Sequence, residues 1–205
     1  MSRKLVWLAC AGALLAAVSG QAATLSGKAT ADDQFTIYLA TSIGPQTGSG
    51  IVSGTACCTP VSFSGINLVD GLDYYLLVDA VNLTKSPAMF TADLTITGTG
   101  FTFSTGTKTL STDTTHWTSG TTSFASATGT PFDLSSTAIW GSVLISGAKI
   151  WAYNANYANG VAGHSYFVSK ISSTVSAVPE PTAAALMLAG LAGIGMLSRR
   201  RRTAG

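Results

Sequence analysis

The chain has 205 residues and a formal net charge of +2, and only 10% of its residues are charged. Between Thr24 and Ala177 it has five lysines and eight aspartates but no arginine or glutamate, which gives a formal charge of −3. The positive charge therefore lies at the chain ends, and the central stretch lacks the basic surface that nucleic-acid binding requires. Its length suits one domain with a buried core. Its serine, threonine and glycine content favours an exported all-β protein over a cytosolic enzyme.

Residues 1–23 have the three parts of an export signal. Two basic residues come first, apolar residues follow at 5–18, and residues 20–22 give the small-x-small pattern of a signal-peptidase site. The apolar run is shorter than the ~20 residues of a membrane helix, so a retained anchor is the weaker interpretation. We expect export through the Sec machinery and cleavage by signal peptidase after Ala22 or Ala23.

Alternating apolar and polar residues predict β-strands along the domain at 24–177. Phe35, Ile37 and Leu39 are apolar and alternate with Thr36 and Tyr38, as in a half-buried strand. Further β-rich runs lie at 61–65, 74–81, 90–96, 101–103, 139–145, 149–153 and 166–171. Turn residues separate these runs, and a linker is expected at 172–178. The pattern predicts an antiparallel β-sandwich of the jelly-roll kind.

Parts of this domain resemble galactose-binding-like jelly rolls. The run 32–39 resembles their opening strand, and residues 148–151 resemble the segment before their final strand. Trp117 takes the place of a core tryptophan in such domains. The resemblance implies a β-sandwich, but residues 40–44 replace the usual Asn-Gly turn, so it implies no ligand site.

Cys57 and Cys58 are adjacent. Export favours oxidation, yet neighbouring Cα atoms lie only ~3.8 Å apart, below the usual range for a disulfide. A vicinal disulfide and free or intermolecular thiols are both open alternatives. Two cysteines cannot close a zinc site, so we predict no metal centre here.

Aspartates occur in two close pairs, Asp32 with Asp33 and Asp70 with Asp73. Their oxygens could coordinate calcium, although turn formation is the simpler interpretation.

A catalytic triad could be assembled on paper from His116, Asp113 and one of many serines. No Gly-x-Ser-x-Gly motif supports it. We therefore predict no catalytic residue, no cofactor and no enzyme activity.

One loop combines aromatic and amide side chains. Aromatic rings suit the apolar side of a pyranose, and amides bond its hydroxyls. The predicted glycan contacts are Tyr153, Asn156 and Tyr157. Trp117, Trp140 and Trp151 could extend this platform, although burial in the core is the commoner outcome for such rings.

The C-terminal segment has three parts in a fixed order. Pro179, Glu180 and Pro181 keep the backbone extended. The fifteen residues 183–197 are predicted to form an apolar helix of roughly 22 Å, short of the ~30 Å hydrocarbon core. A basic cluster ends it: Arg199, Arg200, Arg201 and Arg202. The positive-inside rule keeps these arginines in the cytoplasm and the domain outside.

This order resembles the PEP-CTERM sorting signal, which occurs in Gram-negative bacteria that make exopolysaccharide. The resemblance implies that an exosortase, a membrane cysteine peptidase, recognises residues 179–181 and cuts near them, with residues 199–202 as the stop-transfer. An ordinary membrane anchor is the alternative. We expect an exported surface or extracellular-matrix protein with a structural or adhesive role. The alternative function is a carbohydrate-binding module that retains exopolysaccharide.

Overall fold

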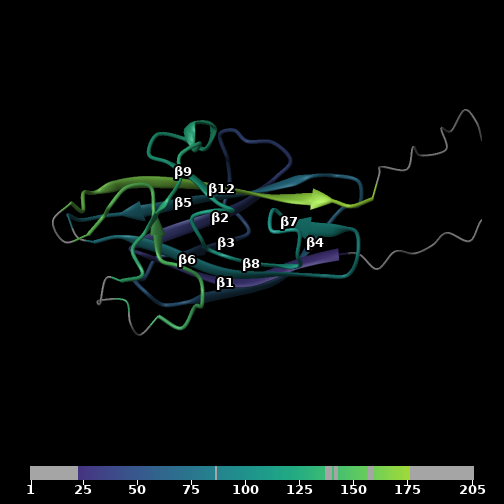
Figure 1. Ribbon diagram of the computed structural model, residues 1–205, viewed down its shortest axis with the longest axis horizontal. Coiled ribbons are helices and arrows are strands. Elements are labelled where there is room, and N and C mark those ends of the chain that lie inside the picture. Colours follow the sequence, from purple (N-terminus) through teal and green to yellow (C-terminus); the bar gives the residue numbers. More distant parts are fainter. Residues whose placement is uncertain (1–22, 86, 137–139, 141–142, 157–158, 176–205) are drawn as a thin grey trace, which may run out of the picture.

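The structure is a computed structural model that describes residues 23–85, 87–136, 140, 143–156 and 159–175. Two six-stranded sheets pack face to face, and they form the upper and lower layers in Figure 1. The described strand pairs are antiparallel. The predicted antiparallel β-sandwich is confirmed. Residues 1–22 of the predicted export signal and the C-terminal segment from residue 176 lie outside the described residues, whereas Ala23 is described.

Sheet A has the strand order β10-β11-β6-β1-β4, and β8 also pairs with β6. Its strands are β1 (Ala23–Asp32), β4 (Val61–Leu68), β6 (Met89–Thr97), β8 (Thr109–Ser111), β10 (Phe132–Asp133) and β11 (Ile150–Trp151). Sheet B has the order β3-β2-β5-β12-β7, and β9 also pairs with β12. Its strands are β2 (Gln34–Ala40), β3 (Val52–Gly54), β5 (Tyr74–Asn82), β7 (Phe101–Phe103), β9 (Thr118–Gly120) and β12 (Gly163–Ser173). A short 3₁₀ helix, η1 (Phe124–Ser126), follows β9.

The alternation read from the sequence builds the core between the sheets. Phe90 on β6 is fully buried and contacts rings from both layers, with centroid distances of 6.0 Å to Phe35, 6.1 Å to Trp117 and 5.5 Å to Phe167. The three tryptophans of the described domain are at most 2% exposed: Trp117, Trp140 and Trp151. The suggestion that they extend a sugar-stacking surface is therefore wrong, because their rings are buried.

The predicted strand at 139–145 is wrong for the residues that the structure describes. Val143 and Ile145 are buried while Leu144 is 82% exposed, yet none of them pairs in a strand. The segment crosses the outer face of sheet A instead, where Lys28 of β1 donates from Nζ to the Leu144 carbonyl (2.8 Å). The loop lies below sheet A in Figure 1. One face of a covering loop is buried, as in a strand, so both produce the same alternation.

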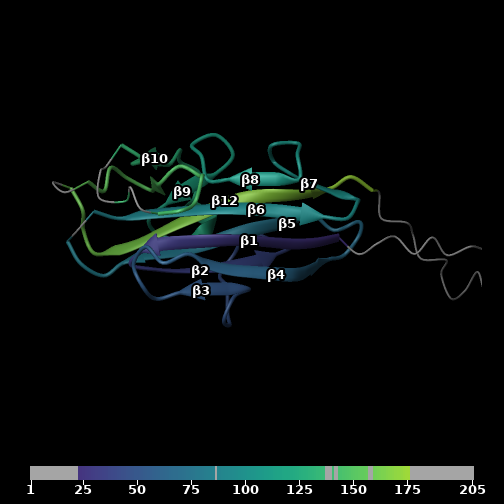
Figure 2. The same ribbon diagram turned by 90° about the horizontal axis from the view of Figure 1, so that it is seen from below.

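Strand β1 was not predicted, although it lies between β4 and β6 in sheet A. Its sequence ATLSGKATAD contains one large apolar residue, so the periodic signal is faint. The predicted linker also starts too early, because β12 continues to Ser173 and the Thr174 amide bonds the Gly100 carbonyl (2.8 Å). The start of β1 and the end of β12 lie at the same end of the sandwich (Figure 2).

Candidate functional site

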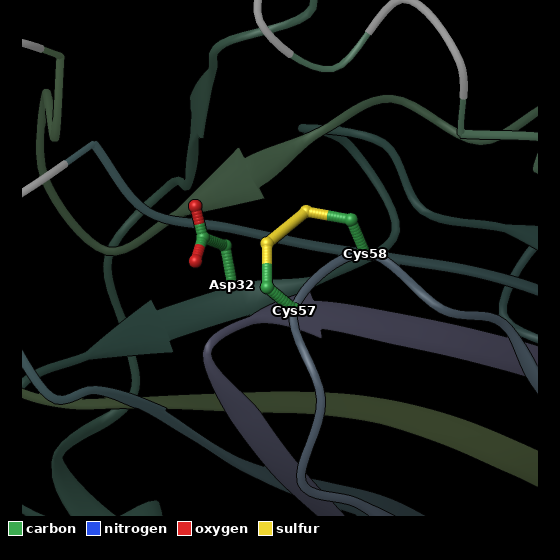
Figure 3. A group of neighbouring side chains, drawn as sticks. All are labelled: Asp32, Cys57 and Cys58. Carbon is green, nitrogen blue, oxygen red and sulfur yellow. A yellow bond between two sulfur atoms is a disulfide. The ribbon is translucent and has the colours of Figure 1, made fainter.

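A sulfur and carboxylate cluster lies at the end of β1. Cys57 and Cys58 are joined by a disulfide, and the Asp32 side chain lies beside them (Figure 3). Of the two alternatives for these cysteines, the structure has the vicinal disulfide. The Cys58 amide bonds the Ala31 carbonyl (3.1 Å), which ties the cysteine loop to β1. Potential ligand atoms of the three residues lie within 4.8 Å of one another. Because a metal binds thiolates, the disulfide leaves only the Asp32 carboxylate as a ligand.

Asp32 has an unusual electrostatic environment. Burial raises the pKa of its carboxyl to about 6, and a hydrogen bond and the negative charge of Asp33 act in the same direction. A hydrogen bond from Trp140 Nε1 (3.4 Å) partly opposes the shift. Asp33 itself accepts from the Leu83 amide (2.8 Å). This pair therefore holds a strand end and an adjoining loop, in agreement with the turn interpretation.

In the second aspartate pair, Asp73 is bonded by the backbone and by a lysine. Asp73 accepts from Lys170 Nζ (2.6 Å) and from the Ser173 amide (2.9 Å). These bonds hold the pKa of Asp73 below its usual value. Asp73 thus anchors the end of β12, which is a structural role.

The catalytic triad considered from the sequence does not form among the described residues. His116 Nδ1 lies 2.7 Å from Asp113 Oδ2. However, the hydroxyls of Ser104 and Ser169 bond the His116 carbonyl instead of its ring (3.4 and 2.8 Å). Burial raises the Asp113 pKa, but hydrogen bonds from His116 and Thr115 outweigh this and lower it. The arrangement is a hydrogen-bonded turn.

The predicted glycan loop uses its polar groups to hold its own shape. Tyr153 donates from Oη to the Val161 carbonyl (3.0 Å), and Asn156 Oδ1 accepts from the Asn159 amide (3.1 Å). Tyr153 and Asn159 border a cavity of about 420 Å³ that also touches His164. Tyr157 lies outside the described residues.

A second cavity lies on the outer face of sheet B, and we call it the outer-face pocket. Its volume is about 310 Å³. Tyr38 of β2, Asp79 of β5 and Tyr166 of β12 line it from the sheet, and two loops, 44–46 and 122–125, line it from above. The loop that carries η1 lies above sheet B in Figure 1.

Aromatic contacts organise this pocket. The Phe124 ring meets Tyr166 edge-on at a centroid distance of 5.0 Å and meets Tyr38 edge-on at 6.1 Å. His164 stacks on Tyr166 at 5.8 Å, and its Nδ1 lies 2.7 Å from Asp79 Oδ1. Burial, together with the nearby Asp79 charge and Tyr38, raises the pKa of Tyr166, so its phenol stays protonated at neutral pH.

The outer-face pocket was not predicted from the sequence. Tyr38, Asp79 and Tyr166 each occupy an outward position of their strand, and the register places Asp79 directly opposite Tyr166. The sequence signal was present as aromatic residues at outward positions. Only the strand order β2-β5-β12 brings them together.

The C-terminal segment matches a protein-family model. A family model of the PEP-CTERM protein-sorting motif covers residues 177–202. The chain carries a PEP-CTERM motif. This motif marks the protein for export and for sorting by an exosortase to the cell surface. Comparison with curated proteins and with solved structures found no match.

The PEP-CTERM segment lies outside the described residues. In the part of the chain that the structure describes, there is no helix with the length and apolar character needed to cross a membrane.

Proposed function

We propose that this PEP-CTERM protein is a non-enzymatic structural or adhesive component of the cell surface or extracellular matrix, linked to exopolysaccharide. Sec exports it and signal peptidase removes its N-terminal signal. Residues 183–197 then hold it in the inner membrane, with residues 199–202 as the stop-transfer. Exosortase recognises Pro179, Glu180 and Pro181 and cuts near them. The observation that carries this proposal is the motif at residues 177–202.

The geometry of the domain supports processing at this position. The last strand, β12, ends at Ser173, and the Thr174 amide is still bonded to the Gly100 carbonyl (2.8 Å). The sorting motif therefore starts a few residues beyond the last paired backbone. A peptidase needs an extended backbone, and the prolines of the motif favour that form. A cut there leaves the hydrogen bonds of the sandwich intact.

The start of β1 favours one of the two predicted signal-peptidase cleavage sites. Ala23 is fully buried and pairs with Leu68 of β4. Cleavage after Ala22 keeps this pair, whereas cleavage after Ala23 removes it. We therefore favour Ala23 as the first residue of the mature protein.

Intact-mass spectrometry of the protein from the envelope and from the medium of its native host tests this proposal. The expected mass is that of a chain that begins at Ala23 and ends near Pro181. A single membrane-bound species that runs to Gly205 would show that the segment is only an anchor. Substitution of Glu180 by alanine should block the C-terminal cut while leaving the N-terminal cut unchanged.

A carbohydrate-binding module that retains exopolysaccharide is the second candidate. The outer-face pocket favours it, because aromatic rings and a carboxylate converge there beside open surface. The predicted contacts Tyr153, Asn156 and Tyr157 stay a prediction. Loss of glycan retention on Tyr157→Ala, in a protein that remains folded, would place the site in that loop.

A further inference from the structure

We propose that the outer-face pocket binds a neutral hexose unit of a polysaccharide, with Tyr38 and Tyr166 contacting the sugar ring and Asp79 accepting its hydroxyls. This inference rests on the carbohydrate-binding candidate function and deepens it by naming the site and the sugar class. The pocket volume of about 310 Å³ is at the lower end of the ~300–1,000 Å³ of ligand pockets. It therefore suits one sugar unit of a chain that continues along the surface.

The aromatic residues supply the surface that a pyranose needs. One side of a pyranose presents C–H groups, and these are attracted to the negative face of an aromatic ring. Tyr38 and Tyr166 come from strands on either side of β5, and Phe124 meets both rings edge-on. This contact holds the two tyrosines in place before any ligand arrives, which lowers the entropy cost of binding.

The polar residues supply directional hydrogen-bond acceptors for sugar hydroxyls. Asp79 lies on β5, between the strands that carry the tyrosines, and its Oδ1 is 2.7 Å from His164 Nδ1. A carboxylate accepts several hydrogen bonds, so this one leaves capacity for sugar hydroxyls. Gln46 borders the pocket from the loop and bonds the Gly44 carbonyl through Nε2 (2.9 Å). Its side-chain oxygen is a second acceptor.

The lining also disfavours two other ligand classes, anionic ligands and extended peptides. Asp79 is the single charged residue among the lining residues, and neither lysine nor arginine is among them. Phosphates and acidic sugars would meet a negative charge without a cation to offset it. An extended peptide would add to the edge of a sheet, whereas this pocket lies over the interior strands β5 and β12. Neutral saccharides fit the combination of aromatic rings and a hydrogen-bond acceptor that this lining provides.

The test is a ligand-observed NMR titration of the full chain, purified in mild detergent. The probes are cellotriose, maltotriose and β-1,4-galactotriose, with trigalacturonate as the acidic counterpart. We expect at least one neutral trisaccharide to bind with a Kd in the millimolar range or below, and trigalacturonate to bind several-fold more weakly. Tyr166→Ala should weaken the neutral sugar about tenfold, whereas Tyr166→Phe, which keeps the ring, should stay within about twofold.

Tyr75→Ala is the matched control. Tyr75 packs on the same side of sheet B but does not line the pocket, so its removal should leave binding unchanged. Asp79→Asn is a second, isosteric variant that keeps the assay informative if Tyr166→Ala fails to fold. It should weaken binding about threefold, because the amide accepts hydroxyls less strongly than a carboxylate.

Three results would overturn the proposal: no binding of any neutral trisaccharide up to roughly 50 mM, well above millimolar affinity; tighter binding of trigalacturonate; or unchanged binding in both pocket variants. Loss of binding on Tyr153→Ala alone would move the site to the other loop. The titration uses purified protein, so it does not depend on sorting. Failure of the sorting proposal appears only in the intact masses, and the two failures are distinguishable.

Discussion

The outer faces of the two sheets are both covered by loops, but in different ways. On sheet A, the covering loop (described residues 140 and 143–149) is held by directional polar bonds in addition to its buried side chains. Asp93 of β6 accepts from the Ser146 amide and hydroxyl (2.9 and 2.8 Å), and Lys28 bonds the Leu144 carbonyl. On sheet B, backbone pairing of Ser119 with Gly129 closes the covering loop (residues 121–129), and the Phe124 ring packs its tip against Tyr38 and Tyr166.

The difference shows how the means of attachment shapes a surface. Hydrogen bonds to strand side chains place the backbone of the sheet A loop directly against the strands. Edge-on aromatic contacts keep ring centroids 5.0–6.1 Å apart and hold the sheet B loop above the strands. The outer-face pocket lies beside this contact. A sheet face whose covering loop is attached through aromatic rings can thus retain an open pocket. Four substitutions test this comparison.

The largest expected effect is that of Phe124→Ala. Phe124 is 7% exposed and belongs to a small cluster with Leu77, Ala127 and Val168. Its removal leaves a cavity, and we expect the free energy of unfolding to fall by about 3 kcal/mol. Urea denaturation measures this value. A change below about 0.5 kcal/mol, the level of a surface substitution, would show that this loop is not held by its aromatic ring.

Asp93→Ala should have the next largest effect, about 2 kcal/mol, because it leaves the donors of Ser146 and Ser111 without their acceptor and removes the ion pair with Lys28. Hydrogen bonds from these serines outweigh burial and hold the Asp93 pKa below its usual value. The contribution of Asp93 is therefore present above pH 4 and is lost as pH falls through the lowered pKa. Denaturation curves at pH 7 and pH 3 should differ more for the wild type than for the variant. Equal pH dependence in the two proteins would contradict this role.

Asp32→Asn should stabilise the protein by about 1 kcal/mol at pH 8, discounted for partial exposure. The folded-state pKa of about 6 lies above the usual value of 3.8, so the folded protein binds this proton more tightly than the unfolded chain. The free energy of unfolding consequently falls as pH rises from about 4 through about 6. Asparagine keeps the acceptor for Trp140 without the charge. The gain should disappear at pH 4, and a gain of equal size at both pH values would contradict the assigned pKa.

The smallest effect is expected for Lys28→Ala, about 0.5 kcal/mol. The Lys28 side chain is 42% exposed, its Nζ lies 3.7 Å from Asp93 Oδ2, and such exposed pairs contribute little. Thermal unfolding in low and high salt measures the effect, which salt should reduce further. A loss as large as that of Asp93→Ala would mean that the lysine, rather than the serines, holds the sheet A loop.

The fold class could be predicted because strands with one buried face alternate visibly. Phe35 and Ile37 on β2 gave that signal, and both are buried. Strand β1 gave almost none, because alanine and glycine supply little contrast between its faces. Val143 and Ile145 gave a clear alternation that wrongly predicted a strand. A loop packed across a sheet also buries every second residue, although its backbone does not pair.

The candidate site divides in the same way. Residues 153–159 are neighbours in the chain and could be grouped by inspection, although the structure shows that Tyr153 and Asn156 bond their own loop. Tyr38, Asp79 and Tyr166 are widely separated in the chain, and no local pattern connects them. Their meeting depends on strand order and register, which are set by long-range pairing.

The sequence by itself determined the sandwich class, the low charge of the domain and the PEP-CTERM motif at residues 177–202. These properties are local or compositional: alternation acts over a few residues, and the sorting motif is read as an extended chain segment. Only the tertiary structure decided that the tryptophans fill the core, that residues 143–149 cover sheet A, and that two tyrosines and an aspartate line one pocket. Those outcomes depend on which strands become neighbours, and this follows from packing of the whole domain.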